Sequence, residues 1–341
     1  MTQRIGTDAI RRPLRRAWLA AVVLALGTML PAAPSWTQTA TELLSGIVKV
    51  SSRTADDART AQTLGTEREG YGALIDSDGH VLTIGYVVVE SDEIRLTGSD
   101  GKTVPAKLVA YDHNTGFGLV RAIAPLAGKP LRMGDSDMLR PAQVALSASH
   151  GGAQATLPVR VVSRRTFAGY WEYLLEQGIF TVPPIPTFAG AALLNAEGQL
   201  IGVGSLIVEN AVSDEQYSPG NLFIPINAVK PILADMLQGR RSGPNHPWLG
   251  LYTDEMRGRL FVQRLAKDGP AAKAGIVEDE LVLAVAGQKV TGLADFYRKL
   301  WALGQPGVKV PLTLLSLDGN LHQVTVDSID RYGWLRPRRS D

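Results

Sequence analysis

The stretch Gly72-Ala-Leu-Ile-Asp-Ser-Asp-Gly-His-Val-Leu-Thr83 carries the pattern that decides the fold. Two short apolar runs, 72–75 and 81–83, flank a polar tetrapeptide that ends in glycine. Such runs around a tight polar turn are typical of two antiparallel strands joined directly to each other. The stretch therefore predicts a β-hairpin.

The same pattern recurs along the chain. Residues 94–108 repeat it around Ser99-Asp-Gly-Lys102, and residues 192–203 repeat it around Asn195-Ala-Glu-Gly198. Many short strands at this spacing predict a mostly β fold, either a sandwich or a barrel, and periodicity does not choose between the two.

Composition limits the class of protein. A chain of 341 residues is long enough for about two domains and a targeting segment. Hydrophobic residues make up 45% and charged residues 20%, which is typical of a globular chain. There is no cysteine, so disulfides, thiolate zinc sites and a cysteine nucleophile are excluded. The sequence predicts no metal site and no cofactor.

The net charge of +2 is concentrated at the N-terminus. Residues 1–40 carry five arginines and one acid, so removing their +4 from the total leaves −2 for the rest. With no basic excess in the body, nucleic-acid binding has little support. The C-terminal residues 332–341, with three further arginines after 335, are expected to form a basic tail.

Residues 1–40 are expected to be an export segment. An arginine-rich start is followed by the apolar stretch 17–30 and then by small residues and prolines. The apolar stretch is shorter than the roughly 20 residues that span a bilayer comfortably. A cleaved signal peptide and a location outside the cytoplasm are therefore expected, with a membrane anchor, and either Sec-type or twin-arginine export, left open.

Three segments resemble the HtrA/DegP family of serine proteases. They are the hairpin 72–83, the run Leu131-Arg-Met-Gly-Asp-Ser-Asp-Met-Leu-Arg140 and the segment Asn221-Leu-Phe-Ile-Pro-Ile-Asn-Ala-Val-Lys230. Residues 160–179 align poorly with the family. The resemblance implies a chymotrypsin-like double β-barrel over residues 41–238.

The same resemblance shows that all three catalytic positions have changed. Acyl transfer of this kind needs a hydroxyl nucleophile, an imidazole base and a carboxylate that orients the imidazole. At the family's histidine position this chain has Tyr86, at the aspartate position Gly116, and at the serine position Ala189. A methyl group cannot form an acyl-enzyme. Ala191 also replaces a glycine of the oxyanion-hole loop.

A relocated triad is the main alternative. Ser147, Ser149 and His150 are close in sequence, but a nucleophile and base that close together rarely face each other correctly. His80, His113 and His150 are expected to be surface residues of turns and loops.

A second domain follows a polar linker, 239–247. Residues 248–331 resemble the PDZ domain of HtrA-type proteins, most clearly at Gly269-Pro-Ala-Ala-Lys-Ala-Gly-Ile276. Apolar residues at three- and four-residue steps predict a helix over 293–303 that is capped near Thr291.

PDZ domains bind a peptide C-terminus along a sheet edge, and backbone N–H groups hold its carboxylate. The resemblance places that loop at Leu249-Gly-Leu251. The expected peptide-binding residues are Trp248, Leu249, Gly250, Leu251, Phe296 and Leu300. For Phe296 and Leu300, an ordinary core position is an equally good interpretation.

The predicted function is therefore an exported, periplasmic HtrA-like pseudoprotease that binds polypeptide without cutting it. The alternative is an active serine endopeptidase with displaced catalytic groups. Expected partners are polypeptides or protein C-termini, and the resemblance also implies a homotrimer or a mixed oligomer with an active protease.

Overall fold

The quoted stretch forms a hairpin in the computed structural model, which describes residues 36–241 and 243–335. Strand β2 (Glu67–Leu74) pairs antiparallel with β3 (His80–Ile84), with Gly72 opposite Thr83. In the turn, Asp76 Oδ1 accepts hydrogen bonds from the backbone amides of Asp78 and His80. Every residue of β3 is buried, so this hairpin lies in the protein core.

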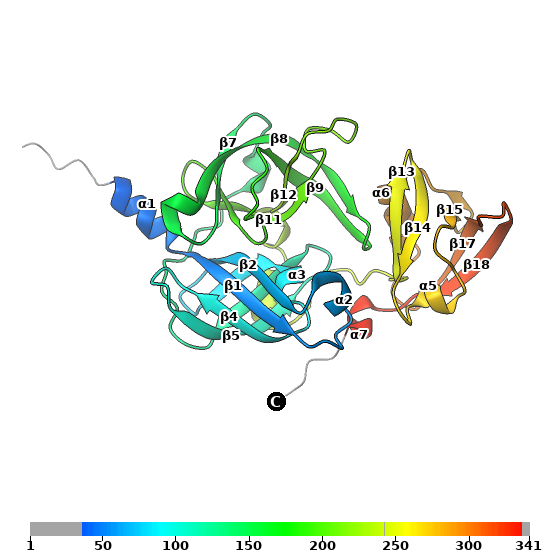
Figure 1. The fold of residues 1–341 in the computed structure, drawn as a ribbon, viewed down its shortest axis with the longest axis horizontal. Helices are drawn as coiled ribbons and strands as arrows, with labels where there is room; N and C mark the ends of the chain where they lie inside the picture. The colour runs from blue at the N-terminus through cyan, green and yellow to red at the C-terminus, as the bar shows by residue number, and fades with distance from the viewer. Residues whose placement is uncertain (1–35, 242, 336–341) are drawn as a thin grey trace, which may run out of the picture. The chain divides into compact units, whose positions relative to one another are not determined.

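The first barrel is closed by six strands in the order β1-β2-β3-β6-β5-β4 (Figure 1). Its other strands are β1 (Ile47–Thr54), β4 (Ser91–Thr97), β5 (Thr103–Tyr111) and β6 (Phe117–Ala122). The hairpins predicted at 72–83 and 94–108 both belong to it.

The second barrel has the strand order β10-β11-β12-β9-β8-β7. Its strands are β7 (Val144–Ala148), β8 (Thr156–Gly169), β9 (Tyr173–Val182), β10 (Ala192–Leu194), β11 (Leu200–Val208) and β12 (Gly220–Pro225). β8 and β9 form the longest ribbon of this barrel (Figure 1). The structure therefore has two closed barrels and not a sandwich, a choice that periodicity in the sequence left open.

A separate sheet follows, with the order β13-β14-β15-β17-β18 and with β16 paired to β15. Its strands are β13 (Leu251–Met256), β14 (Arg259–Leu265), β15 (Leu281–Val285), β16 (Gln288–Lys289), β17 (Lys309–Leu315) and β18 (Leu321–Asp327). Helix α6 (Leu293–Trp301) buries Leu293, Phe296, Tyr297 and Leu300 against it. This α+β unit confirms the predicted fold class.

The remaining helices are short. They are α1 (Trp36–Leu44), α2 (Ala61–Leu64), α3 (Gly85–Val88), α4 (Leu233–Leu237), α5 (Pro270–Lys273) and α7 (Arg331–Trp334), with 3-10 turns at Ser136–Met138, Gly152–Ala155 and Ile226–Ala228. Among the described residues, no helix is long and apolar enough to cross a membrane.

Two predictions need correction. Helix α6 begins at Leu293 after Gly292, and the Thr291 hydroxyl bonds Asp295 instead of capping the helix. The supposed tail is partly folded, because α7 extends to Trp334 and Leu335 is buried. The export segment lies outside the described residues, apart from its last five.

Candidate functional site

Tyr86, which the resemblance places at the family's histidine position, lies in helix α3. Its hydroxyl donates a 2.7 Å hydrogen bond to the Ser205 carbonyl oxygen across the two barrels. Burial raises the pKa of Tyr86 well above its ordinary value. A neutral phenol that already donates its proton cannot act as a general base at neutral pH.

Gly116, which the resemblance places at the aspartate position, leaves little room for a side chain. Its φ of +82° lies in the left-handed region, which disfavours residues with a Cβ atom. A Cβ there would lie 3.0 Å from Ile224 Cδ1 and 3.3 Å from Tyr173 Oη. The Tyr173 hydroxyl itself donates to the Thr115 carbonyl at 3.0 Å. A side chain at this position would therefore require Ile224 and Tyr173 to move.

Ala189, at the serine position, lies in a loop tied to the first barrel. Its carbonyl accepts a 2.7 Å hydrogen bond from the Tyr71 amide, and the next residue, Gly190, donates to the Gly204 carbonyl at 2.8 Å. The loop is held in place, but the side chain at its centre is a methyl group. No covalent intermediate can form on it.

These segments meet at a cavity of about 320 Å³. Tyr86, Gly116 and Phe188, the neighbour of Ala189, all line it. Aromatic rings make up much of the rest of the wall: Tyr111, Tyr170, Trp171, Tyr173, Tyr252 and Trp334. The positions that the resemblance relates to the family's catalytic residues thus lie at or beside a cavity rich in aromatic side chains.

His113 also lines the cavity, and the prediction that it is a surface residue is wrong. Its ring is 8% exposed, with Nδ1 2.9 Å from the Tyr111 hydroxyl and Nε2 2.8 Å from Arg331 Nη1. Burial, and then the nearby guanidinium, lower its pKa well below the ordinary value. Both ring nitrogens are therefore engaged, and the ring stays neutral. Ser205 lines the same cavity, yet neither nitrogen is left to activate it.

The relocated triad weighed above does not assemble in the described structure. The Ser149 hydroxyl donates to the Ala155 carbonyl and contacts the Thr187 hydroxyl. The His150 ring contacts the Gly98 carbonyl at 3.0 Å. Serine and histidine thus have different partners.

One acidic cluster has the composition of a metal site. Asp76, Asp78 and His80 each offer a ligand atom, and these atoms lie within 4.8 Å of one another. His80 is buried, against the sequence prediction, and its Nδ1 lies 2.7 Å from Asp76 Oδ2. Asp76 also accepts hydrogen bonds from two amides of the turn. Stabilisation of the turn therefore explains why these three residues lie together.

The loop 249–251, expected to bind the carboxylate of a peptide, binds the side-chain carboxylate of Glu172 from the same chain. Glu172 Oε1 accepts hydrogen bonds from the amides of Gly250 at 2.7 Å, Leu251 at 3.0 Å and Leu249 at 3.2 Å, and Oε2 lies 3.1 Å from the Leu249 amide. Gly250 has φ +72°, and a Cβ there would lie 2.9 Å from Ala266 Cβ. The converging amides therefore require glycine at this position.

Glu172 comes from the turn between β8 and β9, and the backbone of that turn also contacts the C-terminal sheet. The Thr253 amide on β13 donates to the Tyr170 carbonyl at 3.3 Å. From α6, the Tyr297 hydroxyl donates to the Gly169 carbonyl at 2.8 Å and accepts from the Glu172 amide at 3.0 Å. Burial raises the pKa of Glu172 to about 7, against the lowering by the loop amides.

Phe296 and Leu300 are both 0% exposed and lie in the core of the C-terminal sheet. That burial fits the core interpretation left open above. Trp248 is also buried, and its ring packs 4.8 Å from that of Trp334.

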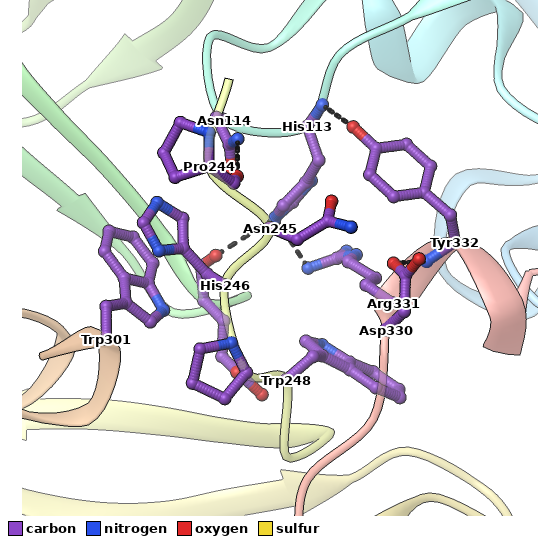
Figure 2. Close-up of a pocket in the computed structure, with 12 residues that line it drawn as sticks. His113, Asn114, Pro244, Asn245, His246, Trp248, Trp301, Asp330, Arg331 and Tyr332 are labelled. Atoms are coloured by element: carbon purple, nitrogen blue, oxygen red, sulfur yellow. Dashed lines mark hydrogen bonds between the residues drawn. The ribbon is translucent and has the colours of Figure 1, made fainter. Parts of the chain in front are cut away.

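Figure 2 shows that the loop around His113 lies beside the two segments that precede and follow the C-terminal sheet along the chain. The His113 amide donates to the Tyr332 hydroxyl at 2.7 Å, and the Asn114 side chain donates to the Pro244 carbonyl at 2.8 Å. His246 stacks on Trp301 with ring centroids 4.2 Å apart. The first barrel thus holds both 244–246 and 330–332.

Sequence reasoning missed Glu172, Arg331 and Tyr332. A glutamate in a turn and an arginine near a basic tail resemble solvated charges, and their partners lie 77 and 218 residues away. One indication of this region was present in the sequence: residues 160–179, which contain Glu172, do not follow the family pattern.

Comparisons with known proteins agree with this architecture. A family model described as a trypsin-like peptidase domain matches residues 70–203. A probable periplasmic DegP-like serine endoprotease of Pseudomonas fluorescens is 26% identical over 286 residues, covering 79% of this chain and 57% of the relative. A probable periplasmic do/HhoA-like serine protease of Haemophilus influenzae is 29% identical over 277 residues, covering 75% and 57%. The chain spans just over half the length of these relatives.

Solved structures show the same fold. The HtrA-type protease AlgW, solved with a decapeptide, aligns with a TM-score of 0.51 at 19% identity, over 90% of this chain and 100% of that one. The serine endoprotease of Yersinia pestis aligns with a TM-score of 0.50 at 20% identity, over 87% and 98%. The chain is therefore similar in sequence to HtrA/DegP-like serine endoproteases, and it shares their fold of two trypsin-like barrels followed by a PDZ-like sheet.

Proposed function

We propose that this protein is an HtrA-like pseudoprotease that binds polypeptide without hydrolysing it. The observation that carries the proposal is Ala189, because a methyl group at the nucleophile position removes the covalent step itself. The other two positions support it. Tyr86 donates its proton to a carbonyl, and Gly116 faces the Tyr173 ring where a carboxylate would be needed.

The binding function is supported by the loop at Leu249-Gly250-Leu251. Its three amides already bind a carboxylate, the group that ends every polypeptide. We propose that residues 248–331, joined to the barrel region 41–238 by the linker 239–247, use this loop to bind protein C-termini. In this proposal Trp248 packs against the loop, and the buried side chains of Phe296 and Leu300 support the groove from the core of the sheet.

A periplasmic location is proposed from the arginine-rich, apolar N-terminus and from relatives that are described as periplasmic. Trimers, or mixed oligomers with an active protease, remain proposals from the family resemblance.

The test is hydrolysis of unfolded casein by the purified protein, with trypsin as positive control. We expect no cleavage by the unmodified protein, since loss of a serine nucleophile alone costs roughly 10⁶-fold in kcat. Ala189→Ser should also be inactive, because Tyr86 and Gly116 remain. Cleavage by the unmodified protein would contradict the proposal and favour the alternative, an endopeptidase with displaced groups.

If cleavage were seen, Ser205→Ala and His113→Ala would show whether the cavity carries it. Loss of cleavage in both variants would assign the activity to these residues, and its persistence would exclude them as its source.

A further inference from the structure

The carboxylate loop holds a side chain that has the chemistry of a peptide end. The Glu172 carboxylate offers the two oxygens and the single negative charge of a C-terminus, and its side chain is only 3% exposed. Three consecutive amides converge on it, which is how backbone N–H groups capture terminal carboxylates. A peptide C-terminus and Glu172 cannot occupy these amides together.

The rest of the turn also lies where a bound peptide would lie. The Tyr170 carbonyl bonds an amide of the edge strand β13, as an added strand does. On the other side, the Tyr297 hydroxyl of α6 bonds the backbone at Gly169 and Glu172. Ala168 and Leu174 pack against the core of the C-terminal sheet. The turn is therefore held by backbone, apolar and carboxylate contacts at once.

The turn itself is built against local preference. Gly169 pairs with Tyr173, which leaves a three-residue loop whose last residue, Glu172, has φ +57°. Glycine is the favoured residue at this place in such loops, and a glutamate is strained there. The strained backbone directs the carboxylate towards the loop. The hydrogen bonds with Gly250 and its neighbours therefore offset the conformational energy of the strained turn.

We propose that the turn between β8 and β9 is an internal ligand of the PDZ-like groove, and that a polypeptide with a free C-terminal carboxylate binds by displacing Glu172. The inference rests on the proposed peptide-binding function and adds its regulation: the groove is closed by the barrel domain until a C-terminus competes for the three amides. Because the competitor is a carboxylate, a peptide with an amidated end is a poor displacer.

The test compares binding of fluorescein-labelled decapeptides, randomised at their last four positions, by fluorescence anisotropy with the full chain. Glu172→Gly removes the carboxylate and relieves the positive φ, so the turn should keep its shape. We expect its Kd for the pool to be at least tenfold lower than that of the unmodified protein. An amidated version of the pool should bind to neither protein.

Glu176→Gln is the matched control. Glu176 lies on the same ribbon, but its carboxylate forms an exposed ion pair with Arg298 at 2.7 Å. Its Kd should equal that of the unmodified protein. Gly250→Glu, which places a side chain into the loop, should abolish binding in the Glu172→Gly background. Thermal melting of each variant checks that it is folded.

The outcomes separate the two proposals. Equal Kd values for the unmodified protein and Glu172→Gly, with binding still dependent on the free carboxylate, would overturn the internal ligand and leave the peptide-binding function in place. Absence of binding in every variant would overturn both. Hydrogen exchange gives a second readout: the amides of Leu249, Gly250 and Leu251 should exchange faster in Glu172→Gly, while those of the first barrel stay unchanged.

Discussion

The Tyr173 hydroxyl lies 3.3 Å from the point that a Cβ atom on Gly116 would occupy. Gly116→Asp should therefore lower the free energy of unfolding for two reasons, the left-handed φ and the contact with Tyr173 and Ile224. We expect a loss of about 2–3 kcal/mol, measured by urea unfolding.

The matched control is Gly101→Asp. Gly101 has nearly the same φ, +77°, but nothing lies within 4 Å of its added Cβ. This variant should lose about 1 kcal/mol, the conformational cost alone. Equal losses at the two positions would show that Tyr173 does not exclude a side chain from position 116.

A second prediction concerns pH. Burial raises the pKa of Glu172 to about 7 in the folded protein, from an ordinary value of 4.5. Below about pH 4.5 the carboxyl is protonated in both states. As the pH rises from there to about 7, the exposed carboxyl ionises more readily than the buried one, so the folded state loses stability. Relative to Glu172→Gln, the unmodified protein should lose about 3 kcal/mol between pH 4.5 and 8.

The groups that face Glu172 do not share this titration. The pKa of His113 is lowered in the folded protein, so its contribution has the opposite sign and is common to the unmodified protein and Glu172→Gln, while burial raises the pKa values of Tyr252 and Tyr297. Urea midpoints at pH 5 and pH 8 measure the effect. A parallel pH profile in Glu172→Gln would assign it to other groups.

A third prediction concerns Arg331, which joins α7 to the turn. Its Nη1 donates to the Trp171 carbonyl and lies 2.8 Å from His113 Nε2. Arg331→Met keeps most of the apolar volume and removes these bonds, so we expect a loss of about 2 kcal/mol and faster cleavage of the linker 239–247 by trypsin, which cuts after arginine.

Arg241→Met is its control, because Arg241 pairs with Asp330 at the surface. We expect a change below about 0.5 kcal/mol. Cleavage after Arg240, a site that both variants keep, as slow in Arg331→Met as in this control would show that Arg331 does not hold the sheet.

A fourth prediction concerns Tyr297, whose hydroxyl bonds the backbone on both sides of the turn. Tyr297→Phe leaves those groups without their partner, and the turn should release more easily. Peptide binding should tighten about fivefold, with about 1–2 kcal/mol lost from global stability. Tyr217→Phe, at a side chain 77% exposed, should change neither quantity. Weaker peptide binding by Tyr297→Phe would argue that its hydroxyl serves the peptide rather than the turn.

Local patterns were enough to predict the β-hairpins, whereas the double barrel was predicted only through the family resemblance. The hairpin 72–83 and the strands around 94–108 and 192–203 formed as expected, because turn chemistry and apolar runs act over a few residues. The three altered catalytic positions were also visible, but only through the family resemblance.

Long-range contacts were not predictable. His113 seemed exposed because it lies beside Asp112 and Asn114, whereas two of the groups that contact its ring, Glu172 and Arg331, lie 59 and 218 residues away. Nothing local to Glu172 indicates that its partner is an amide loop 77 residues later. Such pairings depend on tertiary packing, which no short-range pattern encodes.

Glu172 and the loop that binds it belong to the same chain, so a free peptide must reach a minimum concentration before it displaces Glu172 from the groove. A tethered competitor keeps the same effective concentration however dilute the protein becomes. If the groove were open in about 1% of molecules, the apparent Kd of a free C-terminus would rise about 100-fold. C-termini at low concentration would then leave the groove closed, and only a high local concentration of them would displace Glu172.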